Sequence, residues 1–189
     1  MAITIKPTEI ADIDAIFALR NDPDVLRHQY QPRKGETPAS FEKKLAGHPN
    51  VLGISFRCTS IFDDGVLVGH VMQHFGPGPE GGRRSCECGW NLAKSHWGQG
   101  VMPRALTELF AQLFDEDPRL IVFACCFASN HRSRRVIEKL GFQPDRMHWM
   151  VWLTHLVRSH GRRIEQYRLD RLRYRRAVAR MAPPSESDG

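Results

Sequence analysis

Residues 97–106 read WGQGVMPRAL, and this stretch constrains the fold more than any other part of the sequence. Two glycines stand one residue apart, and Pro103 follows where its missing N–H costs a helix nothing. Apolar residues then recur with helical spacing at Leu106, Leu109, Phe110, Leu113 and Phe114. A glycine loop therefore leads into a helix over 103–115 whose first amides have no partner within the helix. Such amides, together with the helix dipole, bind anions, so we expect a ligand that carries phosphate.

The positive charge of the chain is concentrated near its C-terminus. The whole sequence carries a net charge of +6. Residues 158–180 hold nine arginines against Glu165 and Asp170, a net of +7, so the remainder is close to neutral. This segment is suited to an acidic protein, RNA or phosphate, but it is also typical of a solvated surface helix and strand.

The length of the chain indicates a single domain, and its cysteine pattern indicates reduced thiols. A chain of 189 residues suits one domain, and it contains no apolar run long enough for a membrane span. The N-terminus lacks the basic and apolar regions of a secretion signal. The five cysteines form no CxxC pair, and Cys58, Cys125 and Cys126 lie in apolar runs. This pattern favours buried thiols of a cytoplasmic protein over a metal site or a catalytic thiol.

The spacing of apolar residues along the chain alternates between the pattern of strands and the pattern of helices. Asp63, Asp64 and Gly65 form a predicted hairpin turn, and the apolar run 120–127 is typical of a strand buried on both faces. We expect strands at 3–5, 51–61, 66–75, 85–92, 120–127, 147–157 and 164–172. We expect helices at 10–19, 38–46, 103–115, 131–140 and 174–181, followed by a disordered tail. This order predicts an α/β (α+β) domain with a mixed sheet.

Three motifs resemble those of the GNAT acyl-CoA N-acetyltransferases: ECGWNL at 87–92, WGQG at 97–100 and NHRSRRVIEKLGF at 130–142. With GRRIEQYRLDRL at 161–172, they are most similar to the ribosomal-protein N-terminal acetyltransferase branch, which is RimJ/RimL-like. The resemblance covers about residues 3–175. It implies an acetyltransferase domain at 1–175, with 176–189 as the end of a helix and a disordered tail. It also implies a seven-stranded, mostly antiparallel sheet with helices on both faces and a splayed gap between the fourth and fifth strands.

The resemblance implies acetyl-CoA as co-substrate and a site for each of its parts. The pantetheine arm would pair like a strand with the backbone of Asn91, Leu92 and Ala93. The pyrophosphate would lie beside Trp97, on the amides of Gly98, Gln99, Gly100, Val101 and Met102. Asn130 and Ser133 would face the cofactor. Arg134 shares their helix face by spacing and is a further candidate for a phosphate.

Acetyl transfer to an amine requires a proton acceptor, a donor for the tetrahedral oxyanion and a proton for the thiolate. We expect an amide near Leu92 to bind the oxyanion. Glu87 is the preferred base, with His70, His74 and a chain of water molecules as alternatives. Many members of the family carry Tyr where Ile137 stands, so Ser133 is the expected proton donor.

The predicted function is N-acetylation of a primary amine, either a protein N-terminus or a small molecule. Residues 28–37, a hairpin turn at 158–163 and the first two predicted helices are expected to shape the acceptor pocket. The arginine-rich segment is a candidate surface for an acidic or ribosomal partner, and the chain is expected to be a cytoplasmic monomer or homodimer. The alternative is an inactive acyl-CoA-binding or RNA-associated module. No metal site is predicted.

Overall fold

The computed structural model describes residues 2–29, 36–47, 53–78, 82–146 and 162–181. Its strands form one sheet in the order β1-β2-β3-β4-β5-β7-β6. All neighbouring strands are antiparallel except β4 and β5, which are parallel. The strands are β1 (Ile3–Pro7), β2 (Ser55–Asp63), β3 (Val66–Pro77), β4 (Arg84–Leu92), β5 (Ile121–Phe127), β6 (Gln143–Asp145) and β7 (Ile164–Leu169). The predicted mixed, mostly antiparallel sheet is therefore confirmed.

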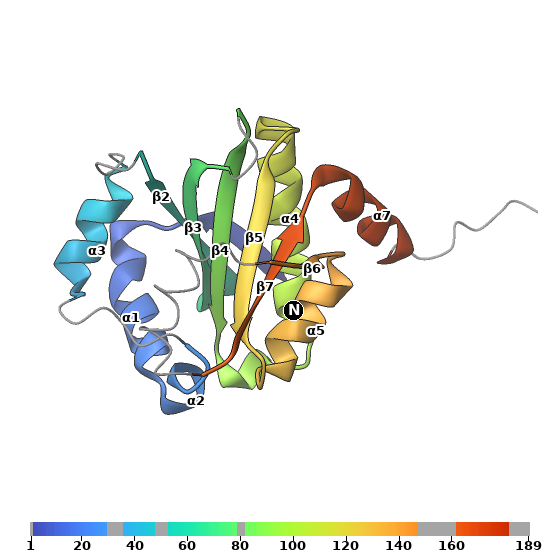
Figure 1. Cartoon of the computed structure of the whole chain (residues 1–189). Coiled ribbons are helices and arrows are strands. Elements are labelled where there is room, and N and C mark those ends of the chain that lie inside the picture. Colours follow the sequence, from blue (N-terminus) through green and yellow to red (C-terminus); the bar gives the residue numbers. More distant parts are fainter. Residues whose placement is uncertain (1, 30–35, 48–52, 79–81, 147–161, 182–189) are drawn as a thin grey trace, which may run out of the picture.

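Helices cover both faces of this sheet, as predicted (Figure 1). On one side lie α1 (Ile13–Asn21), α2 (Pro23–Leu26) and α3 (Pro38–Leu45). On the other lie α4 (Val101–Glu116) and α5 (His131–Lys139), and α7 (Arg171–Met181) packs beside α4. Two short 3-10 turns, η1 (Ile10–Asp12) and η2 (Lys94–His96), precede α1 and the glycine loop. No helix among the described residues is long and apolar enough to cross a membrane.

The larger core lies between the sheet and α4. The apolar stripe of this helix is buried, including Leu106, Phe110 and Phe114. The β5 strand is buried on one face, whereas Phe123 and Cys125 on the other face are only partly buried, so the predicted burial on both faces is incomplete. The smaller core lies under α1 and α3, where the Phe41 ring meets Phe17 and Phe56 edge to face. An apolar core therefore packs against each face of the sheet, and the ends of β4 and β5 lie between these two cores.

Local turn and cap chemistry explains several element boundaries. Asp64 and Gly65 have φ values of 47° and 82°, the pair of left-handed residues that a two-residue hairpin requires, so the predicted turn is confirmed. The α3 helix begins with a reciprocal cap between Thr37 and Ser40. The Asp170 carboxylate accepts from the Arg173 amide at 2.9 Å, which ends β7 and starts α7 earlier than predicted.

Other predicted boundaries differ from the structure. The second strand begins at Ser55, later than its predicted start at residue 51. The predicted first helix begins with a 3-10 turn, whereas its end at Asn21 is where the sequence Asn21-Asp22-Pro23 indicated it. Neither α2 nor β6 was predicted, because four and three residues are too few to show a periodicity. The predicted strand 147–157 and the predicted tail beyond Met181 lie outside the described residues.

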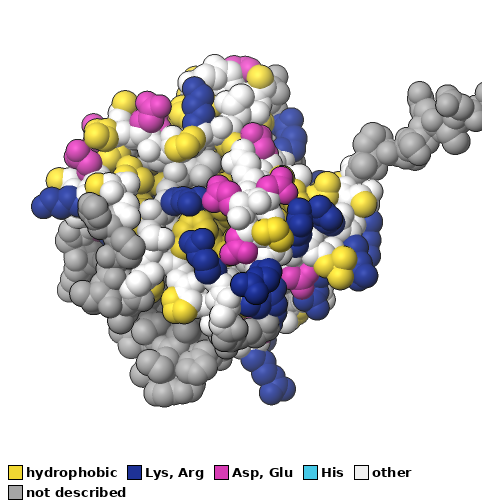
Figure 2. Space-filling model, turned by 90° about the horizontal axis from the view of Figure 1, so that it is seen from above, with side chains coloured by type: hydrophobic (Ala, Val, Ile, Leu, Met, Phe, Trp, Pro, Cys, Tyr) yellow, Lys and Arg dark blue, Asp and Glu magenta, His cyan; other side chains and the backbone are white. Residues whose placement is uncertain are grey.

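The C-terminal segment combines a buried face with a basic one. Tyr174 and Ala177 of α7 are buried, and the Tyr174 hydroxyl donates to the Thr107 carbonyl of α4 at 2.7 Å. Arg171 and Arg173 form ion pairs with Asp115 and Asp170. Lys and Arg side chains gather near the end of α7, with acidic side chains among them (Figure 2). The helix thus belongs to the packed domain and also crosses the predicted boundary between residues 175 and 176.

The cysteine side chains lie in the interior. Four of the five are buried, and all five are free thiols. Burial raises the pKa of the Cys58 and Cys126 thiols to about 11, so both are uncharged at neutral pH. Among the described residues there is no group of His, Cys, Asp and Glu that is suited to a metal ion.

Candidate functional site

The fourth and fifth strands separate before either of them ends. Their parallel pairing runs from Ser85 with Ile121 to Cys88 with Ala124. Beyond this point β4 continues to Leu92 and β5 to Phe127, and no further pairs join them. Backbone donors and acceptors therefore face a gap in the middle of the sheet, where an extended ligand can replace the missing ladder.

The direction of the β4 backbone decides which groups face this gap. The Ala93 amide donates to the Val68 carbonyl of β3 at 2.8 Å. Because successive residues of a strand turn their backbone groups to opposite sides, Asn91 also faces β3, while Trp90 and Leu92 face the gap. The Leu92 carbonyl accepts from the Trp97 indole at 2.8 Å. Of the predicted backbone trio, Leu92 is thus the residue whose amide can meet a pantetheine arm.

The glycine loop turns the chain from β4 into α4. Gly98 and Gly100 have φ values of 78° and 75°, and no atom lies within 4 Å of a Cβ placed on either. Gly100 is the N-cap of α4, and it has no side chain to bond the first amides of the helix. Gln99 bonds the Ser95 carbonyl at 2.6 Å and so ties the loop to η2. The loop therefore presents bare amides over open space, which is what a phosphate site requires.

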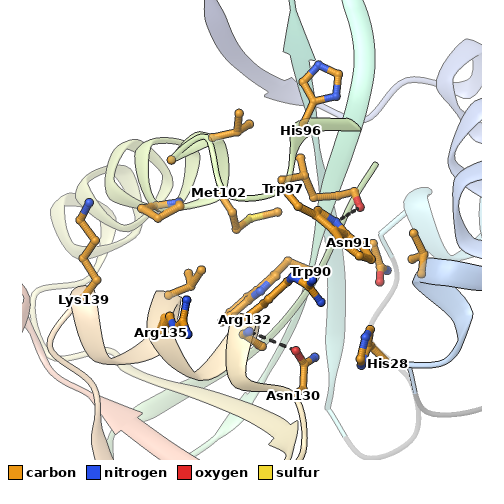
Figure 3. A pocket seen from close by; sticks show the side chains of 18 residues that line it. His28, Trp90, Asn91, His96, Trp97, Met102, Asn130, Arg132, Arg135 and Lys139 are labelled. Atoms are coloured by element: carbon orange, nitrogen blue, oxygen red, sulfur yellow. Dashed lines mark hydrogen bonds between the residues drawn. The ribbon is translucent and has the colours of Figure 1, made fainter. Parts of the chain in front are cut away.

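A cavity of about 390 Å³ joins the sheet gap to the glycine loop (Figure 3). Most of the predicted cofactor-binding residues line it: Asn91, Leu92, Trp97, Gly98, Gly100, Val101, Met102, Asn130 and Ser133. Ala93, Gln99 and Arg134 do not. Among the described residues, the charged side chains that line the cavity are all basic, namely those of Arg132, Arg135 and Lys139. This lining complements a ligand that carries several phosphate charges.

The start of α5 brings two of the predicted residues to the cavity. The Asn130 side chain accepts from the Ser133 amide at 3.1 Å, which makes it the N-cap of the helix (Figure 3). Asn130 therefore acts as a cap and also lines the cavity. Ile137 is fully buried in the core, so Ser133 is the hydroxyl that α5 presents to the cavity.

The structure does not bring Arg134 to the cavity. Its guanidinium bonds Glu165 of β7 at 2.8 Å and the Ala128 carbonyl at 2.7 Å. Arg132, Arg135 and Lys139 line the cavity instead, because residues three and seven positions apart share the helix face that looks toward the glycine loop. The Arg132 guanidinium also lies 4.8 Å from the centre of the Trp97 ring and so connects α5 to the loop.

The predicted bases lie on the sheet face beneath α1 and α3. Glu87 and His74 stand opposite each other on β4 and β3, and neither lines the cavity. His70 is fully buried, and its Nε2 accepts from the Asn91 amide at 3.1 Å. Burial, with a smaller contribution from the charge of Arg20, lowers the pKa of His70 to about 3. A group that binds protons so weakly is a poor general base at neutral pH.

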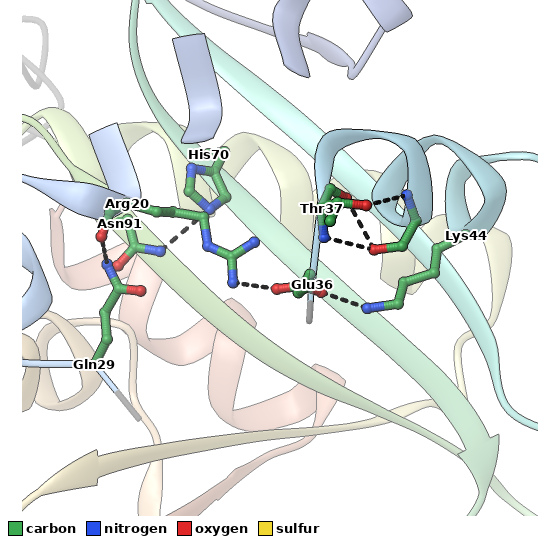
Figure 4. Close-up of polar contacts among 8 residues, drawn as sticks. Arg20, Gln29, Glu36, Thr37, Lys44, His70 and Asn91 are labelled. Carbon is green, nitrogen blue, oxygen red and sulfur yellow. Dashed lines mark hydrogen bonds and ion pairs between the residues drawn. The ribbon is translucent and has the colours of Figure 1, made fainter. Parts of the chain in front are cut away.

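Two groups of polar side chains lie between the sheet and the N-terminal helices, the His70–Asn91 pair and the ion pairs of Glu36 (Figure 4). Arg20 of α1 donates to Glu36 at 2.6 Å, and Lys44 of α3 bonds the other carboxylate oxygen. Burial alone would raise the pKa of Glu36, but the bonds and charges of Lys44 and Arg20 outweigh it and lower the pKa. Asn91, which bonds His70, also lines the cavity, so this buried pair lies beside the end of β4.

Several lining residues were not predicted. Arg132, Arg135 and Lys139 share a helix spacing that a search for a basic face would have found. Trp90 lies inside the ECGWNL motif. Val25 of α2 was not predicted, and nothing in its local sequence places it beside residues 90–103. His28, in the turn after α2, belongs to the segment 28–37 that was expected to shape the acceptor pocket, whereas residues 30–35 and 158–161 of the two expected segments lie outside the described residues.

The comparisons with known proteins agree with this geometry. A family described as "Acetyltransferase (GNAT) domain" matches residues 2–143. No curated protein sequence gives a significant match. Spermidine N-acetyltransferase from Vibrio cholerae, solved with CoA and spermine, has a TM-score of 0.67 at 16% identity and covers 91% of this chain and 97% of its own. Mycobacterium smegmatis RimJ, solved with CoA-disulfide, has a TM-score of 0.67 at 19% identity, with 95% and 89% covered. Salmonella typhimurium yncA, solved with acetyl-CoA, has a TM-score of 0.62 at 20% identity, with 90% and 94% covered.

Proposed function

Because this chain belongs to the GNAT acetyltransferase domain family, we propose that it transfers the acetyl group of acetyl-CoA to a primary amine. The acceptor is either a protein N-terminus or a small-molecule amine. One observation carries the proposal: the gap between β4 and β5 opens into the same cavity as the bare amides of the glycine loop. Acetyl-CoA carries both a thioester arm and a pyrophosphate, so its binding requires a strand gap for the arm and free amides for the pyrophosphate within one cavity.

The parts of acetyl-CoA match successive parts of the cavity. In this proposal the pyrophosphate binds the amides from Gly98 to Met102, most of which line the cavity, and the pantetheine arm lies along β4. The basic side chains on α5 bind phosphate oxygens. We propose that the thioester carbonyl binds at the Leu92 amide, which then stabilises the oxyanion.

Direct transfer then follows from this placement. The deprotonated amine attacks the thioester carbon, and the C–S bond breaks as the carbonyl forms again. Ser133, which lines the cavity, is proposed to donate a hydrogen bond or proton to the leaving thiolate. Glu87 stays a predicted base, although it does not line the cavity. The RimJ/RimL-like branch, the cytoplasmic location and an acidic or ribosomal partner for the arginine-rich segment also stay predictions.

Two measurements test the proposal. Isothermal titration with acetyl-CoA should show binding, and a panel of amines that includes N-terminal peptides and polyamines should release free thiol in the presence of the protein. The Ser133→Ala variant keeps the backbone amide that Asn130 caps. It should therefore bind acetyl-CoA normally but turn over about 10²-fold more slowly. Binding without thiol release for any amine would favour the acyl-CoA-binding module, and absence of binding at millimolar acetyl-CoA would contradict both.

A further inference from the structure

The cavity contains few side chains that can take a proton from an amine. Its described lining includes five titratable side chains, and three of them, Arg132, Arg135 and Lys139, are cationic at neutral pH. The other two are His28 and His96. His96 is engaged at both ring nitrogens, since Nδ1 lies 2.8 Å from the Ser95 hydroxyl and Nε2 lies 3.4 Å from the Asp63 carboxylate. His28 is therefore the candidate that the cavity offers.

The turn that carries His28 is held in place from two directions. Its amide donates to the carbonyl of buried Val25 at 3.1 Å, which continues the turn of α2. Arg162, just before β7, donates to the Arg27 carbonyl at 2.9 Å. The His28 ring centre lies 6.3 Å from that of Trp97, the residue whose indole bonds the Leu92 carbonyl. Figure 3 shows the imidazole directed into the cavity on the side of Asn91.

The surroundings of His28 favour its neutral form. Nδ1 is buried, and no described group bonds it, so a proton on this atom would lack an acceptor. Burial lowers the pKa of His28, and the charges of Arg27, Arg132 and Arg162 lower it further, against the opposing charge of Asp24. The imidazole is therefore neutral at neutral pH. Because Nδ1 is buried, the nitrogen that accepts the proton of the amine must be Nε2, and Nδ1 then carries the proton of the neutral ring.

We propose that His28 is the general base of the reaction, which accepts the proton of the acceptor ammonium directly or through one water molecule. The inference rests on the proposed acetyl transfer. Loss of this proton frees the nitrogen lone pair, and the nitrogen forms its bond to the thioester carbon while the C–S bond breaks. The amine loses its second proton as the amide forms, and the thiolate gains one. The net products are the acetylated amine, CoA with a free thiol and one proton, which passes from His28 to solvent.

Bound CoA should raise the pKa of His28. Its phosphates bring negative charge to Arg132 and the other basic residues of α5, and so weaken the repulsion that these charges exert on a protonated His28. The pKa of His28 should rise toward neutrality in the complex, where a general base is most effective. NMR titration of the His28 ring, with and without CoA, measures this shift without any turnover. A pKa that stays unchanged or falls when CoA binds would contradict the coupling.

The kinetic test compares His28→Gln with a matched histidine variant. His131→Gln is the control, because His131 is exposed on α5 and does not line the cavity. For His28→Gln we expect kcat to fall about 10²-fold. The acid limb of the wild-type pH profile should disappear, while the Kd for acetyl-CoA changes less than about twofold. His131→Gln should behave like the wild type. Normal acetyl-CoA binding by His28→Gln and by a second variant, His28→Asn, shows that the fold is intact.

The outcomes separate the two proposals. Full turnover and an unchanged acid limb in His28→Gln would overturn the role of His28 and leave the acetyltransferase intact. Loss of the acid limb in Glu87→Gln, with His28→Gln unaffected, would assign the base to Glu87 instead. A wild-type protein that acetylates no amine would overturn the proposed function, and the role of His28 with it.

Discussion

Gly100 has a left-handed backbone at the N-cap of α4, where backbone amides rather than side chains line the cavity. Its φ of 75° is unfavourable for residues with a side chain, although the space around its Cβ position is open. Gly65 in the β2–β3 hairpin matches it in both respects, with a φ of 82° and no atom within 4 Å. A comparison of alanine variants at the two glycines therefore distinguishes a loss of stability through backbone strain from a loss of ligand affinity.

We expect Gly100→Ala to weaken acetyl-CoA binding and Gly65→Ala to leave it unchanged. Both substitutions should lower the free energy of unfolding by about 1–2 kcal/mol, because both force alanine into the left-handed region. Only Gly100→Ala also reorients the first amides of α4 and places a methyl group beside them. Calorimetric titration with acetyl-CoA and thermal melts check this prediction. Equal acetyl-CoA affinity in the two variants would remove the glycine loop from the binding site.

At the scale of an element, α5 divides its basic side chains between two faces. Arg134 pairs with Glu165 of β7, whereas Arg132, Arg135 and Lys139 line the cavity. Side chains on the first face therefore support the contact of the helix with the sheet, and those on the second are available to a ligand.

For Arg135→Gln we expect a loss of about 10-fold or more in acetyl-CoA affinity, the usual value of a charge-assisted hydrogen bond. The affinity for S-acetylpantetheine, which has no phosphate, should not change. Arg134→Gln should lower thermal stability and leave acetyl-CoA affinity unaffected. Titrations of both variants with both ligands check this prediction. A larger loss of acetyl-CoA affinity in Arg134→Gln than in Arg135→Gln would contradict the division of faces.

At the scale of the whole molecule, buried His70 links folding to pH. Burial, with the charge of Arg20, lowers its pKa from the ordinary 6.5 to about 3 in the folded state. Between these values the unfolded chain binds a proton that the folded protein does not, so stability rises with pH through this window. The slope from one such group is about 1.4 kcal/mol per pH unit. Glu36 adds to it at the acid end, because its lowered pKa stabilises the fold above the unfolded value.

We expect His70→Gln to reduce the loss of stability between pH 6 and pH 4, because the glutamine does not titrate and its carbonyl can still accept from Asn91. His74→Gln, which changes an exposed histidine on the same strand, serves as the comparison variant. Urea unfolding at several pH values measures both. An unchanged slope in His70→Gln would show that His70 is not the group that couples folding to pH.

The sequence by itself determined those features that depend on contacts within a few residues. The left-handed Asp64–Gly65 turn, the glycine loop that leads into α4, the Asn130 cap and the apolar stripe of α4 all follow from local geometry and periodicity. The resemblance of its motifs supplied the mostly antiparallel, seven-stranded sheet and the gap between β4 and β5, whereas the order of the strands came from the structure.

Only the tertiary structure decided which side chains meet in the cavity. Arg135 rather than Arg134 faces the glycine loop, and Arg134 pairs instead with Glu165 of β7. The tertiary structure buried His70 and brought His28 from the turn after α2 to the side of Trp97. These placements depend on the packing of segments that are tens of residues apart, and no local pattern records that packing.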